Sequence, residues 1–224
     1  MRKLLIILGL ILFSGSYIFA KDVVPTQTFG ADINSYGVYQ ISQNSMTLYS
    51  EPENSAKVIK KISWNSEATD TEGLELQDLF ILYLPERGLA LLDVVDETDD
   101  WVKVVYDKKK NSSGWIEKDD RFKFMPWGMF MSMYGKKYGL YTLKGAPEVS
   151  KVMRTAPENF AQISGEMNCP KVINLNTVKG NWILVSVSDL DKFPKTGFVR
   201  WRADSGEKYY FPKIKVITGI NDFK

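Results

Sequence analysis

The stretch that decides the fold is WVKVVYDKKKNSSGWI, residues 101–116. Apolar side chains alternate with outward-facing positions from Trp101 to Tyr106, a polar run of Lys, Asn and Ser follows, and the chain returns as Gly-Trp-Ile. Alternation with a period of two is typical of a β-hairpin that has one buried face. We therefore expect two antiparallel strands joined by the polar turn.

The same order of signals occurs again further along the chain. NWILVSVS begins at Asn181, and after another polar turn the triplet Gly197-Phe198-Val199 corresponds to the first Gly-Trp-Ile. Upstream, LYSEPENSAKVI from Leu48 is matched with LYTLKGAPEVSKVM from Leu140. We interpret this pattern as an internal repeat, which favours two domains in a chain of 224 residues.

Each half thus contains Leu-Tyr, a Pro-centred turn, a Lys-Val strand start, a Trp strand and a Gly-aromatic-aliphatic triplet. This order resembles the bacterial SH3-like (SH3b) family of small exported β-barrels, over roughly residues 37–211. The residues that carry the resemblance are Leu48, Pro52, Lys57, Val58, Trp101, Val104, Gly114, Trp115 and Ile116, followed by Leu140, Pro147, Lys151, Val152, Trp182, Val185, Gly197, Phe198 and Val199. In the second set Phe198 replaces the expected Trp. The resemblance implies an all-β fold of two tandem small SH3-like barrels with short loops and little helix.

The predicted organisation follows from these matches. It comprises a signal peptide (1–20), a flexible lead-in (21–36), a first SH3-like domain (37–123), an inter-domain seam rich in Met and aromatic residues (124–137), a divergent second SH3-like domain (138–213) and a tail (214–224). The glycines of the seam argue against a long helix, and we expect it to pack the two domains together. We expect residues 79–84, LFILYL, to form one buried strand. Residues 64–75 are expected to be an inserted acidic loop, and residues 21–122 to fold alone.

The first twenty residues have the form of a secretory signal peptide. Basic Arg2 and Lys3 precede an apolar run, small residues and Ala20. The run is shorter than the ~20 residues that a membrane-spanning helix needs. We expect export to the periplasm or the cell envelope, with no membrane attachment after cleavage. The only cysteine, Cys169, cannot form an internal disulfide and is expected to be a small buried side chain.

The charge of the chain gives no support for nucleic-acid binding. The formal net charge is +2, and removal of the predicted signal peptide brings it near zero. The distribution is uneven, because residues 51–100 are acidic and the following residues are basic. This pattern fits two domains of opposite sign, and it also fits ordinary solvated surfaces.

Composition also removes most catalytic chemistry. The chain has no histidine, so Ser-His-Asp and Cys-His catalysis and His-ligated metal sites are excluded. Ser205-Gly206-Glu207-Lys208 and Lys195-Thr196-Gly197 imitate motifs of penicillin-recognising enzymes, but their order is reversed and the third motif is missing. No spacing singles out a catalytic carboxylate pair. We therefore expect a protein that is not an enzyme and needs no cofactor.

Recognition is the function that remains. By resemblance, the ligand would lie in a shallow aromatic groove between two long loops and would be a peptidoglycan peptide or an envelope protein. The candidate groove residues are Tyr49, Asp70, Glu72, Trp101, Trp115, Tyr141, Trp182 and Phe198. The acidic Asp70 and Glu72 would favour a cationic peptide. Each aromatic residue can equally be a core side chain, and an adaptor that binds only proteins is an alternative.

A second alternative concerns the methionines of the seam. If this segment were a strand, Met129, Met131 and Met133 would present their thioethers on one face, beside Trp127. Soft thioether ligands select cuprous ion. The sequence thus also permits a Met-based periplasmic copper-binding protein.

Overall fold

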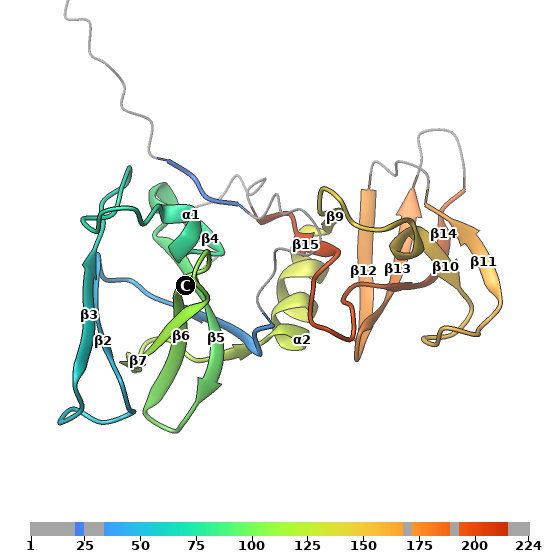
Figure 1. Cartoon of the computed structure of the whole chain (residues 1–224). Helices are drawn as coiled ribbons and strands as arrows, with labels where there is room; N and C mark the ends of the chain where they lie inside the picture. Colours follow the sequence, from blue (N-terminus) through green and yellow to red (C-terminus); the bar gives the residue numbers. More distant parts are fainter. Residues whose placement is uncertain (1–20, 25–33, 168–171, 189–192, 215–224) are drawn as a thin grey trace, which may run out of the picture.

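The computed structural model describes residues 21–24, 34–167, 172–188 and 193–214. The predicted signal peptide, Cys169 and residues 215–224 of the predicted tail lie outside these residues. The chain is mostly β-structure in two antiparallel sheets, which agrees with the prediction of an all-β protein (Figure 1).

The first sheet contains β1 (Gly37–Gln40), β2 (Ser45–Tyr49), β3 (Val58–Ser63), β4 (Leu82–Leu84), β5 (Leu89–Glu97), β6 (Trp101–Asp107), β7 (Ser112–Glu117) and β8 (Met125–Pro126). The second contains β9 (Leu140–Thr142), β10 (Val152–Arg154), β11 (Ile163–Glu166), β12 (Val172–Lys179), β13 (Trp182–Ser188), β14 (Lys195–Arg200) and β15 (Tyr210–Pro212). The helical segments are α1 (Leu76–Leu79), η1 (Pro85–Arg87), α2 (Trp127–Phe130), η2 (Met131–Gly135), α3 (Lys136–Tyr138) and η3 (Glu148–Lys151).

The two sheets have the same strand order. The first runs β3-β2-β7-β6-β5-β1-β8, with β4 paired to β5, and the second runs β11-β10-β14-β13-β12-β9-β15. In each sheet a three-stranded meander (β5 to β7, or β12 to β14) is flanked by a hairpin (β2–β3, or β10–β11) and by a short strand (β1, or β9). Apart from β4, the strands of one sheet can therefore be matched one to one with those of the other.

The predicted hairpin of residues 101–116 forms as β6 and β7, and its echo forms as β13 and β14. Val104 lies opposite Gly114 in the first hairpin, and Val185 lies opposite Gly197 in the second. Both predicted hairpins are thus confirmed, and the structure adds that they share the same register.

A β-bulge interrupts the preceding strand at the same place in both sheets. It lies between Val94 and Asp96 of β5 and between Leu175 and Thr177 of β12. Bulges are specific features of a strand pair. Their shared position extends the match from strand order to individual residues.

The predicted alignment of the upstream segments is wrong: the segment that begins at Leu140 was aligned with β2, but it forms β9, the counterpart of β1. Tyr49 of β2 lies opposite Trp115 of β7, whereas the position opposite Phe198 of β14 is taken by Arg154 of β10. Tyr141 belongs to β9, which takes the place of β1. The segment that matches LYSEPENSAKVI is therefore MRTAPENFAQIS and not LYTLKGAPEVSKVM.

With the strands matched this way, a repeated motif becomes visible. Residues 52–56 and 157–161 both read Pro-Glu-Asn-x-Ala. In each turn the amide of the Ala donates to the carbonyl oxygen of the Glu, at 3.1 Å in the first turn and 3.3 Å in the second. The same short sequence thus forms the same turn between β2 and β3 and between β10 and β11.

The glycine of each Gly-aromatic-aliphatic triplet permits a close crossing of strands. A β-carbon at Gly114 would lie 3.1 Å from Cβ of Leu48, and one at Gly197 would lie 3.1 Å from Cβ of Met153. Leu48 and Met153 are themselves matched positions, one residue before Tyr49 and one before Arg154. The motif therefore contains glycine because the neighbouring strand packs directly over it.

The interior consists of two hydrophobic clusters that meet at β5. Leu92 and Val94 belong to a cluster inside the first sheet, whereas Leu89 and Leu91 belong to a cluster that also contains the second sheet's core. Both faces of β5 are buried, which explains its nearly continuous apolar sequence. The second cluster also contains Trp127 of α2, so the helix between the sheets in Figure 1 packs with both of them.

The expectation that the seam avoids a long helix is wrong. α2, η2 and α3 form one uninterrupted helical run from Trp127 to Tyr138, with a π-helical turn in its middle. A β-carbon at Gly135 would lie 2.7 Å from a methyl group of Leu175 and 3.0 Å from one of Leu140. This glycine lets the helix approach the second sheet closely, and tertiary packing outweighs the low helix propensity of glycine.

The apolar stretch of residues 79–84 is also not one strand. α1 ends at Leu79 and β4 begins only at Leu82, although every residue between them is buried. The backbone N–H of Glu75 donates to the Asp78 carboxylate at 3.1 Å, and this capping box begins α1. Residues 64–88 connect β3 to β5, whereas only residues 167–171 connect the matched strands β11 and β12.

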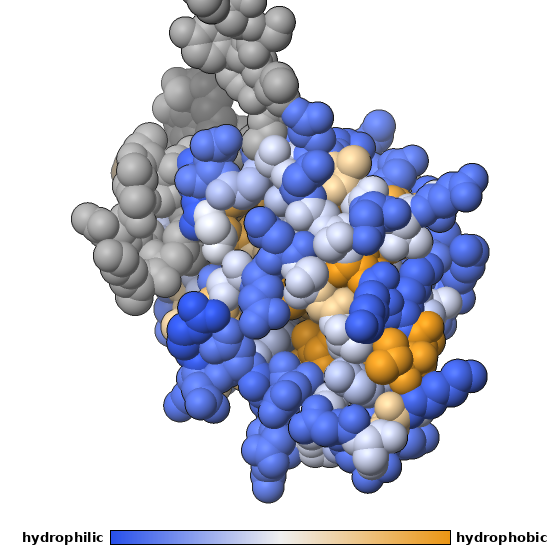
Figure 2. Space-filling view, turned by 90° about the vertical axis from the view of Figure 1, so that its left-hand side faces the viewer, coloured by the Kyte–Doolittle hydropathy of each residue, from blue (hydrophilic) through white to orange (hydrophobic). Residues whose placement is uncertain are grey.

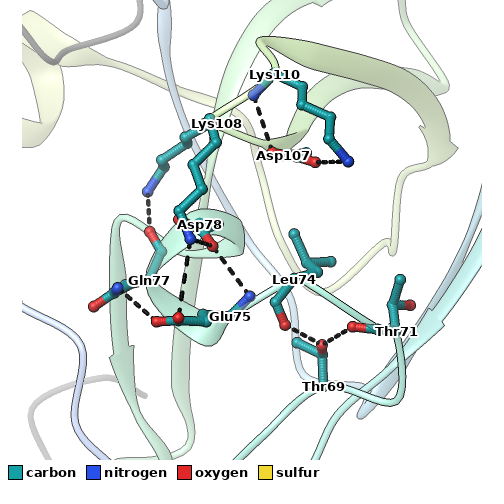
Figure 3. Close-up of polar contacts among 10 residues, drawn as sticks. Thr69, Thr71, Leu74, Glu75, Gln77, Asp78, Asp107, Lys108 and Lys110 are labelled. Carbon is teal, nitrogen blue, oxygen red and sulfur yellow. Dashed lines mark hydrogen bonds and ion pairs between the residues drawn. The ribbon is translucent and has the colours of Figure 1, made fainter.

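The polar turn of the β6–β7 hairpin binds this inserted segment (Figure 3). Lys109 Nζ lies 2.8 Å from the buried Asp78 carboxylate, and Lys108 Nζ donates to the Phe80 carbonyl oxygen at 2.5 Å. A buried carboxylate needs such partners, because desolvation without them costs several kcal/mol. Lys108 and Lys109 therefore form part of the turn and also bind α1 and the residue that follows it.

The predicted flexible lead-in is ordered where the structure describes it. Val23 exchanges backbone hydrogen bonds of 2.9 and 2.8 Å with Tyr83 of β4. Ser35 Oγ donates to the buried Asp93 carboxylate at 2.7 Å and accepts from Trp127 Nε1 at 2.9 Å. These bonds attach residues 21–24 and 34–36 to β4, β5 and the helix.

The outer edge of the first sheet is mostly polar. Figure 2 views the side on which β2 and β3 lie and shows a largely hydrophilic surface with small, separate hydrophobic areas. Val58 and Ile59 of the edge strand β3 are exposed, and Lys57, Lys60 and Lys61 lie beside them. Charged residues of this kind discourage pairing of an edge strand with another chain.

Candidate functional site

Three predicted groove residues of the first sheet come together on its outer face. Tyr49 lies opposite Trp115, and its ring contacts Trp101 edge-on with 5.5 Å between centroids. Lys103, opposite Trp115 in the sheet, places its ammonium 5.7 Å from the Trp115 ring. The three aromatic residues and one cation therefore form a single cluster across β2, β7 and β6.

The two tryptophans of this cluster are buried but do not belong to the interior. Trp101 is 7% exposed and Trp115 is 6% exposed, yet neither is part of either hydrophobic cluster. Their neighbours Val102, Val104 and Ile116 point to the opposite side, where the core lies. The aromatic residues thus form a closely packed outer layer on the sheet.

The acidic residues predicted to accompany these aromatics lie elsewhere. Asp70 accepts hydrogen bonds from Ser63 N at 2.8 Å and Ser63 Oγ at 2.7 Å, and these bonds lower its pKa. Ser63 pairs with Ser45, at the opposite end of β2 from Tyr49. Four residues of strand separate the two ends by about 13 Å. Asp70 therefore supports its own turn, and exposed Glu72 lies in the same loop.

The matched outer face of the second sheet is more open and more basic. Trp182 and Phe198 are half-buried neighbours of Leu184: Trp182 precedes it by two residues on β13, and Phe198 lies opposite it on β14. The Arg200 guanidinium lies 6.0 Å from the Trp182 ring centroid, and Lys179 Nζ lies 5.8 Å from that of Phe198. These cations lie at distances typical of cation–π contacts.

Tyr141 does not join this face. It belongs to β9, and its ring lies 6.2 Å from that of Phe211 in the shared cluster. Burial raises the pKa of its hydroxyl. The prediction that Tyr141 corresponds to Tyr49 is wrong, because the two Leu-Tyr pairs lie on strands that are not matched.

Sequence reasoning missed two residues of the second face. Arg154 takes the position of Tyr49, and its guanidinium donates to the Ala161 carbonyl oxygen at 2.8 Å. Phe160 is fully exposed at the tip of the second Pro-Glu-Asn-x-Ala turn, where the first turn has Ser55. The repeated motif is the signal that could have identified both.

A groove of about 300 Å³ lies beside Tyr49 on the first sheet. It is lined by Tyr39, Gln40, Ile41, Gln43, Met46, Thr47, Tyr49, Ile116, Glu117, Lys118 and Asp119. At its rim the Arg121 guanidinium holds the pKa of Asp119 down, to about 2. Asp119 N donates to the Tyr39 hydroxyl at 2.5 Å, and burial raises the pKa of Tyr39.

The methionines of the seam are not arranged as the copper hypothesis requires. They lie on a helix, so the strand alternation on which that hypothesis depends is wrong. Met129 and Met133 are each 54% exposed, whereas Met131 is fully buried. Met131 therefore does not share an exposed face with Met129 and Met133. Among the described residues, no group of three or more Asp, Glu, His or Cys side chains could hold a metal ion.

No protein-family model matches the chain, and no curated protein matches it at a significant level. The similarity to the SH3-like family therefore stays a prediction. Within the described part of the chain, no helix is both long and apolar enough to cross a membrane.

Proposed function

We propose that the chain is an exported, non-catalytic binding module of the bacterial cell envelope, built from two tandem SH3-like domains. It recognises peptidoglycan peptides or an envelope protein through an aromatic surface. The repeated strand order, the repeated bulge and the repeated Pro-Glu-Asn-x-Ala turn support the duplication. The absence of histidine supports a binding role over a catalytic one.

The observation that carries the proposal is the outer face of the second sheet. Trp182, Leu184 and Phe198 are neighbours on this face and each is partly exposed, and Lys179 and Arg200 lie near the Phe198 and Trp182 rings. Such a surface fits an extended peptide whose apolar groups contact the aromatic side chains while an acidic group meets the exposed Lys179. The ligand we propose is therefore anionic, in contrast to the cationic peptide expected from Asp70 and Glu72.

The first sheet has the supporting role in this proposal. Its matched tryptophans are packed closely, so they contribute little accessible ring surface. The groove beside Tyr49 is the part of this sheet that can receive a side chain of the same ligand or of a second one.

Retention on purified peptidoglycan sacculi tests the proposal. We expect the mature protein to be retained and the Trp182→Ser/Phe198→Ser double variant to lose at least tenfold in affinity, since aromatic side chains commonly carry most of the energy of such an interface. Ile59→Ser is the matched control, because it removes an exposed apolar side chain from β3, outside the proposed surface. Far-ultraviolet circular dichroism shows whether each variant keeps its strands.

The outcomes separate the alternatives. No retention by sacculi, together with capture of a defined envelope protein that depends on Trp182 and Phe198, would replace the wall ligand with a protein partner. Binding that is unchanged in the double variant would refute the proposed surface. A Tyr49→Ser variant that loses binding while the double variant keeps it would move the site to the groove of the first sheet.

A further inference from the structure

The groove beside Tyr49 has the size of a site for one side chain. Its volume of about 300 Å³ lies at the lower end of small-molecule sites, which span about 300–1,000 Å³. Its walls come from β1 and the residues after it, from β2, and from the end of β7 and the residues that follow. The lining side chains that are at least partly exposed are Gln40, Gln43, Thr47, Tyr49, Glu117, Lys118 and Asp119. A ligand in this groove therefore meets a mostly polar surface with one aromatic side chain.

The groove has one lining charge that the protein itself does not neutralise. Lys118 Nζ lies 2.9 Å from the Glu97 carboxylate, and Asp119 is paired with Arg121. Glu117 is exposed, and within the described part of the chain its carboxylate has no ion-pair or hydrogen-bond partner. The charge that remains available to a ligand is therefore negative.

Strand register places Glu117 beside the partly exposed side chains of β2. Tyr49 lies opposite Trp115, two residues before Glu117 on β7. Side chains two residues apart on a strand share a face, and neighbouring antiparallel strands run in opposite directions. Thr47 therefore lies beside Glu117 on the face that carries Tyr49, and all three residues line the groove.

The second sheet has the opposite charge at the matched positions. Glu117 lies opposite the tryptophan of β6, and Arg200 lies opposite the matched Trp182 of β13. Arg154 takes the position of Tyr49. The shared fold thus permits either charge at this place. The first sheet attracts a cation where the second sheet repels one.

The accessible groups of the groove suit a primary ammonium on an aliphatic chain. An ammonium has three N–H donors that point in different directions, and hydrogen bonds from it to a carboxylate are stronger than those between neutral groups. Glu117 offers the carboxylate, while Thr47 and Gln43 add neutral oxygen acceptors in the same groove. The methylene groups of such a chain pack well on an apolar surface, which the side chain of Tyr49 supplies.

We infer that this groove binds the side chain of a lysine-type residue in an extended peptide. The ammonium group binds the Glu117 carboxylate, and the methylene groups lie along Tyr49. The inference rests on the proposed function in taking the ligand to be an extended peptide. It adds that the first sheet recognises a basic side chain, whereas the second sheet recognises an acidic group. The carboxylate that recognises the cation is then Glu117, and not the Asp70 or Glu72 expected from the sequence.

A titration of the mature protein with a short lysine peptide tests the inference. The probe is N-acetyl-Ala-Lys-Ala-amide, and the readout is the set of backbone amide signals in proton–nitrogen correlation spectra. We expect saturable shifts that include the signals of Thr47, Tyr49 and Glu117. The same peptide acetylated on its lysine side chain keeps the chain but loses the charge, and we expect it to bind at least tenfold more weakly.

Two variants with the same change of charge assign the binding to Glu117. Glu117→Gln removes the charge from an exposed side chain with little change in size, and we expect at least tenfold weaker binding of the lysine peptide. Glu72→Gln is the matched control, because Glu72 is also exposed but lies outside the groove, and it is expected to bind normally. Absence of saturable shifts in the unmodified protein, or equal binding by a folded Glu117→Gln variant, would overturn the inference.

The Trp182→Ser/Phe198→Ser double variant separates this inference from the proposed function. It leaves the groove of the first sheet intact, so we expect it to bind the lysine peptide normally. Retention on sacculi without binding of the lysine peptide would refute the inference and leave the proposed function standing. Binding of the lysine peptide that depends on Glu117, without retention on sacculi, would support the inference and count against a cell-wall ligand.

Discussion

The two sheets agree in their interiors and differ on their outer faces. Inside, Val104 matches Val185 and Gly114 matches Gly197, with the same pairing in each hairpin. Outside, the tyrosine of β2 corresponds to an arginine of β10, and the lysine opposite Trp115 corresponds to a leucine opposite Phe198.

This difference separates what the fold needs from what each sheet can bind. The interior pairs are constrained because a packed core tolerates little change in volume. The outer pairs are less constrained, and they differ between the sheets. The first sheet has a closely packed aromatic layer, whereas the second has partly exposed aromatic residues beside two cations. Differences in binding between the two sheets are therefore expected on their outer faces.

The largest expected effect concerns the core that both sheets share. Residues 21–122 lack the helix, and removing it exposes the face of β4 and β5 that carries Leu82, Leu84, Leu89 and Leu91. Each buried leucine is worth about 1.5–3 kcal/mol, and the sum is comparable with a whole domain's stability of about 5–15 kcal/mol. We therefore expect that this fragment does not fold alone, contrary to the sequence-based expectation.

A longer fragment provides the control. Residues 21–139 keep the helix that covers β4 and β5, and we expect them to show a cooperative thermal transition by circular dichroism. Equally cooperative transitions of both fragments would show that the first sheet needs no support from the helix.

The next effect tests the equivalence of the two interiors. Leu48 and Met153 are matched, fully buried and packed on the matched glycines. Replacing either by Ala is expected to cost about 2–5 kcal/mol. Urea denaturation of the two variants measures both values. A large cost at one position with none at the other would break the match of β2 with β10.

A smaller effect is expected at the glycines themselves. Gly114→Ala and Gly197→Ala place a β-carbon 3.1 Å from Leu48 and Met153, and overpacking of this kind costs about 1–3 kcal/mol. Gly165→Ala is the matched control, because its β-carbon would meet only Lys195 at an ordinary distance of 3.9 Å. Urea midpoints that fall for the first two variants and stay unchanged for the third are the expected result.

Local pattern was enough to predict the hairpins, because alternation fixes which face of a strand is buried. It was not enough to align the upstream segments. The Leu-Tyr pairs at Leu48 and Leu140 agree in letters, but only strand pairing shows that one lies on β2 and the other on β9. The helix of residues 127–138 was missed because glycine propensity is a local quantity, whereas contact of Gly135 with Leu175 is not.

The candidate sites also differ in how far the sequence could predict them. The outer aromatic faces could be predicted, since Trp101, Trp115, Trp182 and Phe198 stand on predicted strands. The groove beside Tyr49 could not, because its walls come from three separated parts of the chain, within residues 39–43, 46–49 and 116–119.

The smallest expected effect is the response to pH of Asp119, which lies at the rim of the groove on the first sheet. The hydrogen bonds and charge of Arg121 lower the pKa of Asp119 from its usual 3.8 to about 2. A depressed carboxyl pKa stabilises the folded state above about pH 4, and this contribution is lost as the pH falls towards 2. Because Asp119 lies at the surface, the effect on stability is small. Carboxyl carbon chemical shifts should titrate near 2 for Asp119 and return towards 3.8 in Arg121→Gln. A pKa that stays near 2 in the variant would mean that Arg121 is not the partner of Asp119.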